Sequence, residues 1–278
     1  MTPTRAITAS DYTRGMLVRI HVSATVKNGF GSVVPALLLS AVVALTGCGG
    51  GSDDEEPTLT VFGASSLTEA LTEYGGSFEG AKVRSSFAGS DELAAQIRQG
   101  AKGDVFASAD TDYPAELHRE GLAGKPVVFA RNRLVVVPTG GEAKTLADLA
   151  KPDAIIAIGD PSVPVGAYTR EVLKRLPAPE REAILANVRT EEPEVSSVLA
   201  KVVNGAADAG FVYATDAKTV AGQVHTVAIP NSLQPDVAYA AVVVSDSGEP
   251  DLAKRYLDGL LHGAGAADLR RAGFLPPP

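Results

Sequence analysis

The residue types that most often build reactive sites are scarce in this sequence of 278 residues. It contains one cysteine, four histidines and no tryptophan. A single cysteine cannot form an intramolecular disulfide, so the folded domain must be stabilised by packing. A zinc-type site needs several Cys or His ligands close together, and the sequence has no such cluster. These absences argue against a disulfide scaffold and against a metal-cation site.

Positive charge is also in short supply. The chain has 25 Lys and Arg against 33 Asp and Glu, a formal net charge of −8, and without residues 1–47 the balance becomes 21 against 32, or −11. This acidity argues against nucleic acid and acidic membrane surfaces as partners. The negative net charge repels an anionic ligand, but this repulsion is screened beyond about 8 Å at physiological salt. Such a ligand would therefore have to be held by short-range contacts.

The remaining composition is that of an ordinary globular protein. Apolar residues make up 45% and charged residues 21%, with 28 Gly and 18 Pro. These fractions exclude a disordered or fibrous chain, and the length is sufficient for two domains.

The first 47 residues have the pattern of an export signal. Arg14, Arg19 and Lys27 precede the apolar run 33–46, which is too short for a comfortable membrane span. The run ends in "LTGC", which resembles a bacterial lipobox and predicts lipidation of Cys48. The alternative is a plain secretory signal with a chance cysteine, and translation could start at Met1 or at Met16.

Residues 48–57 contain the lipidated cysteine and then "GGGSDDEEP", which predicts a flexible tether. We therefore expect the domain to lie outside the cytoplasm, anchored to the outer face of the cell membrane.

From residue 58 onward, strand-like runs alternate with helical patterns, which is typical of α/β folds with parallel strands. We expect two lobes, one formed by residues 58–131 and 224–278 and the other by residues 132–223. The alternative is one continuous doubly wound sheet. In either fold, a ligand would lie at the carboxyl ends of the strands.

Several predicted strands pass into helices through small or hydroxyl residues. In "VFGASSLTEA" (61–70), Ser66 and Glu69 have the spacing of an N-terminal capping box, and Ser90 stands at a similar strand-to-helix junction. Two further helix starts follow in 159–173 and 191–205. Helix N-termini carry unpaired N–H groups and partial positive charge, so several of them around one crevice would form an anion site without Lys or Arg.

Seven segments in this order carry a family resemblance: "TVFGASSLTEA", "SFAGSDELAAQI", "GDVFASADTDY", "RLVVVP", "IAIGDPSVPVGAY", "GFVYATDA" and "LRRAGF". The chain resembles the bacterial molybdate-binding proteins of ABC uptake transporters from about residue 58 to residue 274. The resemblance implies a monomeric α/β receptor with the type II periplasmic-binding-protein fold, no cofactor, and its ligand in the cleft between two lobes. It also implies an ABC permease with a cytoplasmic ATPase as partner.

The resemblance further implies which residues hold the oxyanion. Ser66 and Ser90 match serines that each give a hydroxyl and an N–H group, Val165 and Val195 match positions that give a backbone N–H, and Tyr213 matches a tyrosine that gives its hydroxyl. They would contact the oxygens of molybdate, and not the metal itself. The assigned set contains only donors, which suits molybdate and tungstate because both are fully deprotonated at neutral pH.

Other functions remain open at this stage. Sulfate is also an acceptor-only dianion, phosphate usually carries a proton that needs an acceptor, and a small organic anion would favour an Arg or Lys in the cleft. A serine hydrolase is a remote alternative, because "GASSL" does not match G-x-S-x-G and His118, His225 and His262 lie outside the seven segments. We expect a receptor and not an enzyme.

Overall fold

The computed structural model describes residues 56–140 and 143–278, which belong to one compact unit. The predicted signal peptide, Cys48 and most of the predicted tether lie outside the described residues.

The described chain contains two separate five-stranded sheets. The first has the order β2 (Lys82–Ala88), β1 (Thr58–Ala64), β3 (Val105–Ser108), β10 (Val237–Val243) and β4 (Val127–Asn132). Its β1 is parallel to β2 and β3, whereas β10 is antiparallel to β3 and β4. The second has the order β7 (Val188–Glu192), β6 (Ile156–Gly159), β8 (Ala209–Tyr213), β5 (Leu134–Pro138) and β9 (Val227–Ala228).

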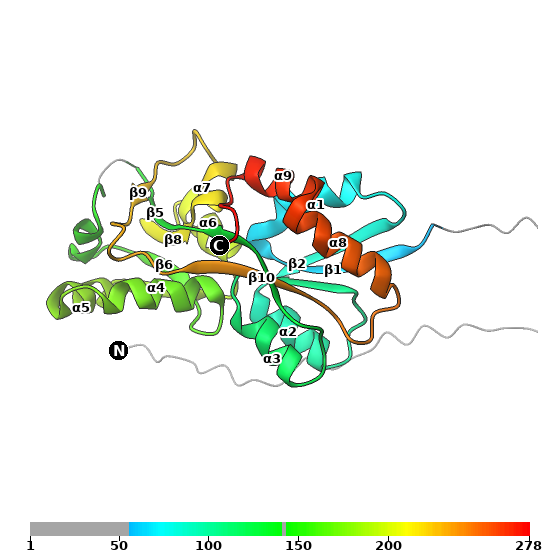
Figure 1. Ribbon diagram of the computed structural model, residues 1–278. Helices are drawn as coiled ribbons and strands as arrows, with labels where there is room; N and C mark the ends of the chain where they lie inside the picture. The colour runs from blue at the N-terminus through cyan, green and yellow to red at the C-terminus, as the bar shows by residue number, and fades with distance from the viewer. Residues whose placement is uncertain (1–55, 141–142) are drawn as a thin grey trace, which may run out of the picture. The chain divides into compact units, whose positions relative to one another are not determined.

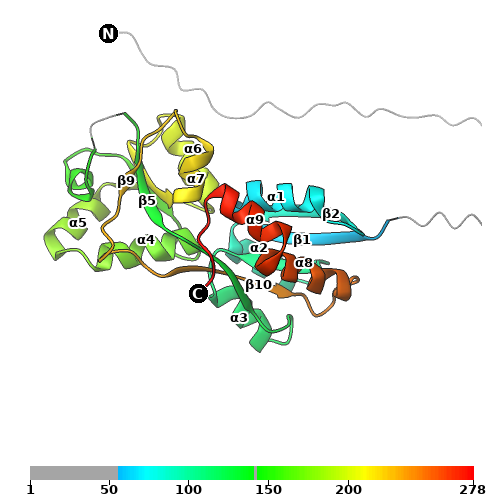
Figure 2. The ribbon, with the colours of Figure 1, turned by 45° about the horizontal axis from the view of Figure 1, so that its top comes forward.

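Helices cover both faces of each sheet (Figures 1 and 2). The first sheet carries α1 (Thr68–Ser77), α8 (Pro250–His262) and α9 (Ala264–Ala272) on one face and α2 (Ser90–Arg98) and α3 (Asp112–Arg119) on the other. The second sheet packs against α4 (Pro164–Lys174), α5 (Ala178–Ala186), α6 (Val195–Val203) and α7 (Ala214–Thr219). Two short 3₁₀ helices complete the described elements, η1 (Ser65–Leu67) and η2 (Leu146–Ala150).

The local sequence explains these elements well. In α2, Leu93 and Ile97 are four residues apart, and both are buried on the same helix face. Gly100 follows the helix with φ of +87°, a left-handed conformation that glycine adopts without steric strain. The central strands β6 and β8 of the second sheet are buried on both faces, and every residue in each is buried.

The two sheets with their helices form two lobes, which confirms the predicted two-lobed α/β fold and excludes the single continuous sheet. The chain passes from β4 to β5 at Arg133 and returns through residues 229–236 between β9 and β10. The return was expected at residue 224, but β9 still pairs with β5 of the second sheet. The crossing therefore lies later, because Val227 is buried in the second lobe.

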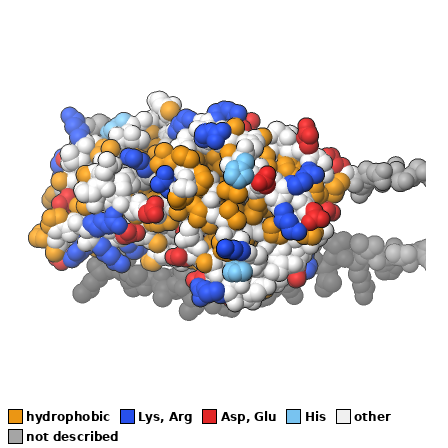
Figure 3. Space-filling model, in the orientation of Figure 1, with side chains coloured by type: hydrophobic (Ala, Val, Ile, Leu, Met, Phe, Trp, Pro, Cys, Tyr) orange, Lys and Arg blue, Asp and Glu red, His pale blue; other side chains and the backbone are white. Residues whose placement is uncertain are grey.

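The surface seen in Figure 3 carries Lys, Arg, Asp and Glu side chains around a more hydrophobic middle, and both signs of charge are interspersed. Within residues 56–140 and 143–278, no helix combines the length and the apolar character that crossing a bilayer would require.

Candidate anion-binding site

The structure brings all five predicted site residues to one small cavity between the lobes. The cavity has a volume of about 10 Å³, close to the minimum for one buried water molecule. Residues at or just after the ends of β1, β2 and β3 line it from the first lobe, and residues at or just after the ends of β6, β7 and β8 line it from the second. Among them are Ser66, Ser90, Val165, Val195 and Tyr213.

Ser66 does not cap a helix as predicted. The chain forms η1 before α1, so Ser66 lies inside the first turn, and neither helix has a side-chain hydrogen bond at its N-cap. The predicted capping box with Glu69 is therefore wrong. The Ser66 hydroxyl instead lies 3.0 Å from the hydroxyl of Tyr239 on β10, because the tight 3₁₀ turn directs this side chain into the protein.

Tyr239 belongs to a buried chain of hydrogen bonds that includes the Ser66 hydroxyl. The side-chain amide of Asn132 lies 3.4 Å from the Tyr239 oxygen and can only donate to it. Tyr239 can then donate its own proton to the Ser66 oxygen. In that arrangement, the proton of Ser66 is available for a group in the cavity.

Ser90 is arranged in the same way by a backbone group. Its side chain is 1% exposed, and its Oγ accepts a hydrogen bond of 3.1 Å from the N–H group of Ala109. The bond ties the start of α2 to the residue that follows β3. The Ser90 proton is therefore also free to point into the cavity.

Val165 and Val195 bring helix N-termini to the cavity from the second lobe. Val165 is the second residue of α4, after Pro164, and Val195 is the first residue of α6. N–H groups in a first helical turn have no acceptor within the helix and carry partial positive charge. Gly166 makes the tight entry into α4 possible, because a Cβ there would lie 1.9 Å from the carbonyl oxygen of Asp160.

Tyr213 contributes a buried hydroxyl that has no partner among the described residues. The side chain lies at the end of β8, is 1% exposed, and packs edge-on against Tyr239 at 5.7 Å between ring centroids. Burial raises the pKa of Tyr213 well above its ordinary value, so the hydroxyl keeps its proton and remains a donor. A buried donor without an acceptor is unfavourable unless a ligand supplies the acceptor.

Two carboxyl groups lie near the cavity without lining it. Asp216 accepts a bond of 3.1 Å from the N–H group of Tyr213, and Asp110 accepts bonds from Ser108 Oγ at 2.9 Å and the Tyr113 N–H group at 3.2 Å. Burial raises the pKa of Asp216 to about 7 and that of Asp110 to about 6. Asp216 is thus partly protonated near pH 7, which limits its repulsion of an anion, whereas Asp110 remains mostly ionised.

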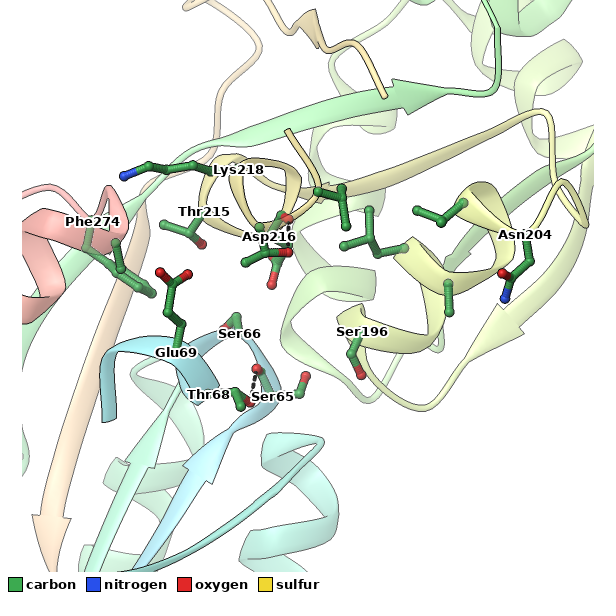
Figure 4. A pocket seen from close by; sticks show the side chains of 16 residues that line it. Ser65, Ser66, Thr68, Glu69, Ser196, Asn204, Thr215, Asp216, Lys218 and Phe274 are labelled. Carbon is green, nitrogen blue, oxygen red and sulfur yellow. Dashed lines mark hydrogen bonds between the residues drawn. The ribbon is translucent and has the colours of Figure 1, made fainter. Parts of the chain in front are cut away.

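A larger pocket of about 780 Å³ adjoins the small cavity and shares Ser65 and Ser66 with it. Figure 4 shows Thr215 and Asp216 facing the start of α1, with Ser196 on the opposite side. This pocket is open and does not contact the other four predicted site residues. The small cavity is therefore the better candidate for the anion.

The lining of the small cavity bears on the alternative functions. Among the described residues around it, none is Lys, Arg or His, and one, Glu194, carries a carboxylate, which accepts a bond of 2.7 Å from the Ser196 hydroxyl. His118 and His225 lie beside the backbone oxygens of Ala123 and Ala143, at 3.0 and 3.2 Å. The nucleophile and base of a hydrolase are therefore not assembled around Ser66, whose partner is Tyr239.

Sequence analysis missed the groups that orient the two serines, which are Tyr239, Asn132 and the backbone of Ala109. Tyr239 did carry a signal, since it interrupts the apolar strand "VAYAAVVV" with a buried hydroxyl that needs a partner.

Comparisons with known proteins agree with this geometry. The family described as "Bacterial extracellular solute-binding protein" matches residues 59–275. The molybdate-binding protein ModA of Mycobacterium tuberculosis is 37% identical over 261 residues, which cover 88% of this chain and 97% of the relative. ModA of Escherichia coli is 31% identical over 234 residues, covering 79% and 90%. The structure of the Azotobacter vinelandii periplasmic molybdate-binding protein superposes with a TM-score of 0.72 at 25% identity, covering 79% of this chain and 100% of that protein.

Proposed function

The chain belongs to the family of bacterial extracellular solute-binding proteins, and we propose that it is the receptor that binds molybdate and delivers it to an ABC permease. The anion would bridge the two lobes and hold them closed, and the closed receptor would dock on the permease and its cytoplasmic ATPase. Tungstate, with the same charge and shape, is expected to bind similarly. The proposal requires no cofactor, because the anion is the transported ligand.

The observation that carries this proposal is the set of hydrogen-bond donors around the cavity, where the one carboxylate of the described lining, that of Glu194, already accepts a bond from Ser196. The oxygen of Ser90 accepts a hydrogen bond from the N–H group of Ala109, that of Ser66 can accept one from Tyr239, and Tyr213 is held in its protonated form. First-turn amides of α4 and α6 add further donors. Each bond from such a donor to a charged oxygen contributes about 1.5–3 kcal/mol.

This arrangement disfavours two of the alternative ligands. Phosphate with one proton would present a donor to a lining in which Ser66, Ser90 and Tyr213 are themselves placed to donate. A small carboxylate is usually paired with an Arg or Lys, and the described lining has neither. Sulfate has the same hydrogen-bonding character as molybdate, so discrimination against it must come from the dimensions of the cavity.

The relatives also support the proposed location. A receptor of an ABC importer acts outside the cytoplasm, and the sequence from residue 45 to residue 57 supports attachment through a lipid on Cys48. Replacing Cys48 with Ala should release the protein from the membrane fraction without changing anion binding.

The test is calorimetric titration of the chain from Gly49 onward, which contains every described helix and strand. Molybdate, tungstate, sulfate and phosphate are titrated separately. We expect tight binding of the first two and none of the last two. Preferential binding of sulfate or phosphate, or no binding of any of the four, would refute the proposal.

A further inference from the structure

A set of contacts joins the lobes on the flank formed by α2, α3 and α4 (Figure 1). The Tyr113 hydroxyl on α3 donates a hydrogen bond of 2.6 Å to the carbonyl oxygen of Ser162. The Ser162 hydroxyl donates a bond of 2.8 Å to Oδ2 of Asp91 on α2. Ser162 belongs to the loop between β6 and α4 of the second lobe, whereas Tyr113 and Asp91 belong to the first lobe.

These contacts lie next to the proposed anion donors but do not line the small cavity. Asp91 directly follows Ser90, and Ser162 comes three residues before Val165. Asp160 fixes the loop further, because its Oδ1 accepts a bond of 3.0 Å from the N–H group of Ser162 and, at 2.9 Å, shares the one proton of the Ser162 hydroxyl with Asp91. A movement of either partner would therefore displace one of the donors that the anion needs.

The opposite flank of the cleft is different. There the larger pocket of about 780 Å³ separates α1 from α6 and α7 and opens to solvent (Figure 4). Interlobe hydrogen bonds also occur elsewhere, because Nζ of Lys218 on α7 donates to the carbonyl oxygen of Arg271 on α9, and the side-chain amide of Asn132 donates to Oγ1 of Thr215 at 2.9 Å. The bonds on the α2–α3–α4 flank differ from these because they adjoin Ser90 and the loop that leads to Val165, and they do not block the cavity.

One atom of this contact also opposes closure of the lobes. Oδ1 of Asp91 is buried without a hydrogen-bond partner among the described residues. It lies beside Gly89, where the carbonyl oxygen of Pro193 from the second lobe also approaches. Closure thus removes the water that would hydrate this carboxylate oxygen and provides no hydrogen-bond donor in its place, which is unfavourable. Such a contact can assist closure but does not hold the lobes together permanently.

We propose that Tyr113, Ser162 and Asp91 form an interlobe latch that sets how long the anion stays bound, although none of the three touches it. The inference rests on the proposed receptor function. The latch residues are positioning residues, because they act through closure and through the placement of Ser90 and Val165. Their removal should therefore accelerate release of the anion much more than it slows association.

The test compares Tyr113→Phe and Ser162→Ala with the unmodified chain from Gly49 onward, by stopped-flow measurement of molybdate association and dissociation. Each variant removes one hydroxyl of the latch, so we expect koff to rise about 2- to 10-fold, with kon changed less than 2-fold. Tyr74→Phe is the matched control, because its hydroxyl donates at 3.2 Å to the backbone oxygen of Tyr256 inside the first lobe. A koff of Tyr113→Phe equal to that of the control would overturn the latch.

A cysteine pair separates failure of the latch from failure of the proposed function. The chain from Gly49 onward has no cysteine, so Asp91→Cys with Ser162→Cys gives a single thiol pair across the cleft. Disulfide formation that molybdate accelerates supports the latch, and a pair that stays reduced under oxidising conditions refutes it. If the unmodified chain binds none of the four anions, the receptor proposal fails, and disulfide formation without anion then decides whether the lobes meet at this flank.

Discussion

Replacing Tyr213 with Phe should weaken anion binding and leave the ligand-free protein as stable as before, or more stable. The substitution removes a buried hydroxyl that has no partner among the described residues and keeps the ring that packs on Tyr239. A bond from this hydroxyl to a charged oxygen is worth about 1.5–3 kcal/mol, so Kd for molybdate should rise roughly 10- to 150-fold.

The effect on stability should have the opposite sign. An unsatisfied buried hydroxyl destabilises a folded protein by about 1–3 kcal/mol, and its removal should recover part of that. For a domain of this size, a gain of 1 kcal/mol corresponds to roughly 2–4 °C in Tm. The measurements are calorimetric titration for Kd and thermal unfolding without anion for Tm.

Tyr256 provides a matched control for this prediction. Its hydroxyl is also buried without a described partner, but it lies on α8, away from the cleft. Tyr256→Phe should raise Tm in the same way and leave Kd unchanged. If Tyr213→Phe loses stability, or if both variants bind molybdate as the unmodified chain does, the reasoning about the free hydroxyl is refuted.

Three further predictions follow from the site and its surroundings. Tyr239→Phe should lower the affinity by about 10-fold and the unfolding free energy by about 1 kcal/mol, because it removes the hydroxyl that is bonded to Ser66. An unchanged Kd in calorimetry would contradict the role of Tyr239 in orienting Ser66. Gly89→Ala should prevent closure and weaken binding, since its Cβ would lie 2.5 Å from the backbone oxygen of Pro193, whereas Gly76→Ala, whose Cβ would have nothing within 4 Å, should bind normally. Small-angle X-ray scattering with molybdate should show a more open form for Gly89→Ala than for Gly76→Ala, and identical curves would contradict the prediction. Burial raises the pKa of Asp216 from 3.8 to about 7, so between these pH values the folded protein keeps a proton that the unfolded chain releases. The unfolding free energy should therefore fall as pH rises from about 4 to about 7, by at most about 4 kcal/mol. Asp216→Asn should flatten the profile of Tm against pH, and an equally steep profile would show that another group is responsible.

The order of elements and the two lobes could be predicted from the sequence because both rest on local patterns. Alternating apolar runs identify buried strands, and small residues at strand ends identify the turns into helices, as at Ser90. The position of the second crossing was missed because β9 has only two residues, Val227 and Ala228. So short a strand carries no periodic signal, and its pairing with β5 depends on contacts distant in sequence.

The error at Ser66 has a similar origin. A capping box and a 3₁₀ turn begin with the same residue types, and the sequence around residue 66 satisfies the spacing of the first. The choice depends on whether the hydroxyl finds a better partner elsewhere, and here Tyr239 lies 3.0 Å away although 173 residues separate the two in the chain. No local pattern could reveal that partner.

The same distant contacts explain how an acidic protein can select an anion. Donor residues alone would not exclude a protonated ligand, because a serine hydroxyl can also accept a hydrogen bond. In the cavity, Tyr239 can donate to the oxygen of Ser66, and the N–H group of Ala109 donates to the oxygen of Ser90. These bonds favour the two hydroxyls as donors to the anion, so the proton of a protonated anion would meet only hydroxyl oxygens that already accept one bond. Selection against protonated anions therefore depends on the groups behind the serines as much as on the serines themselves.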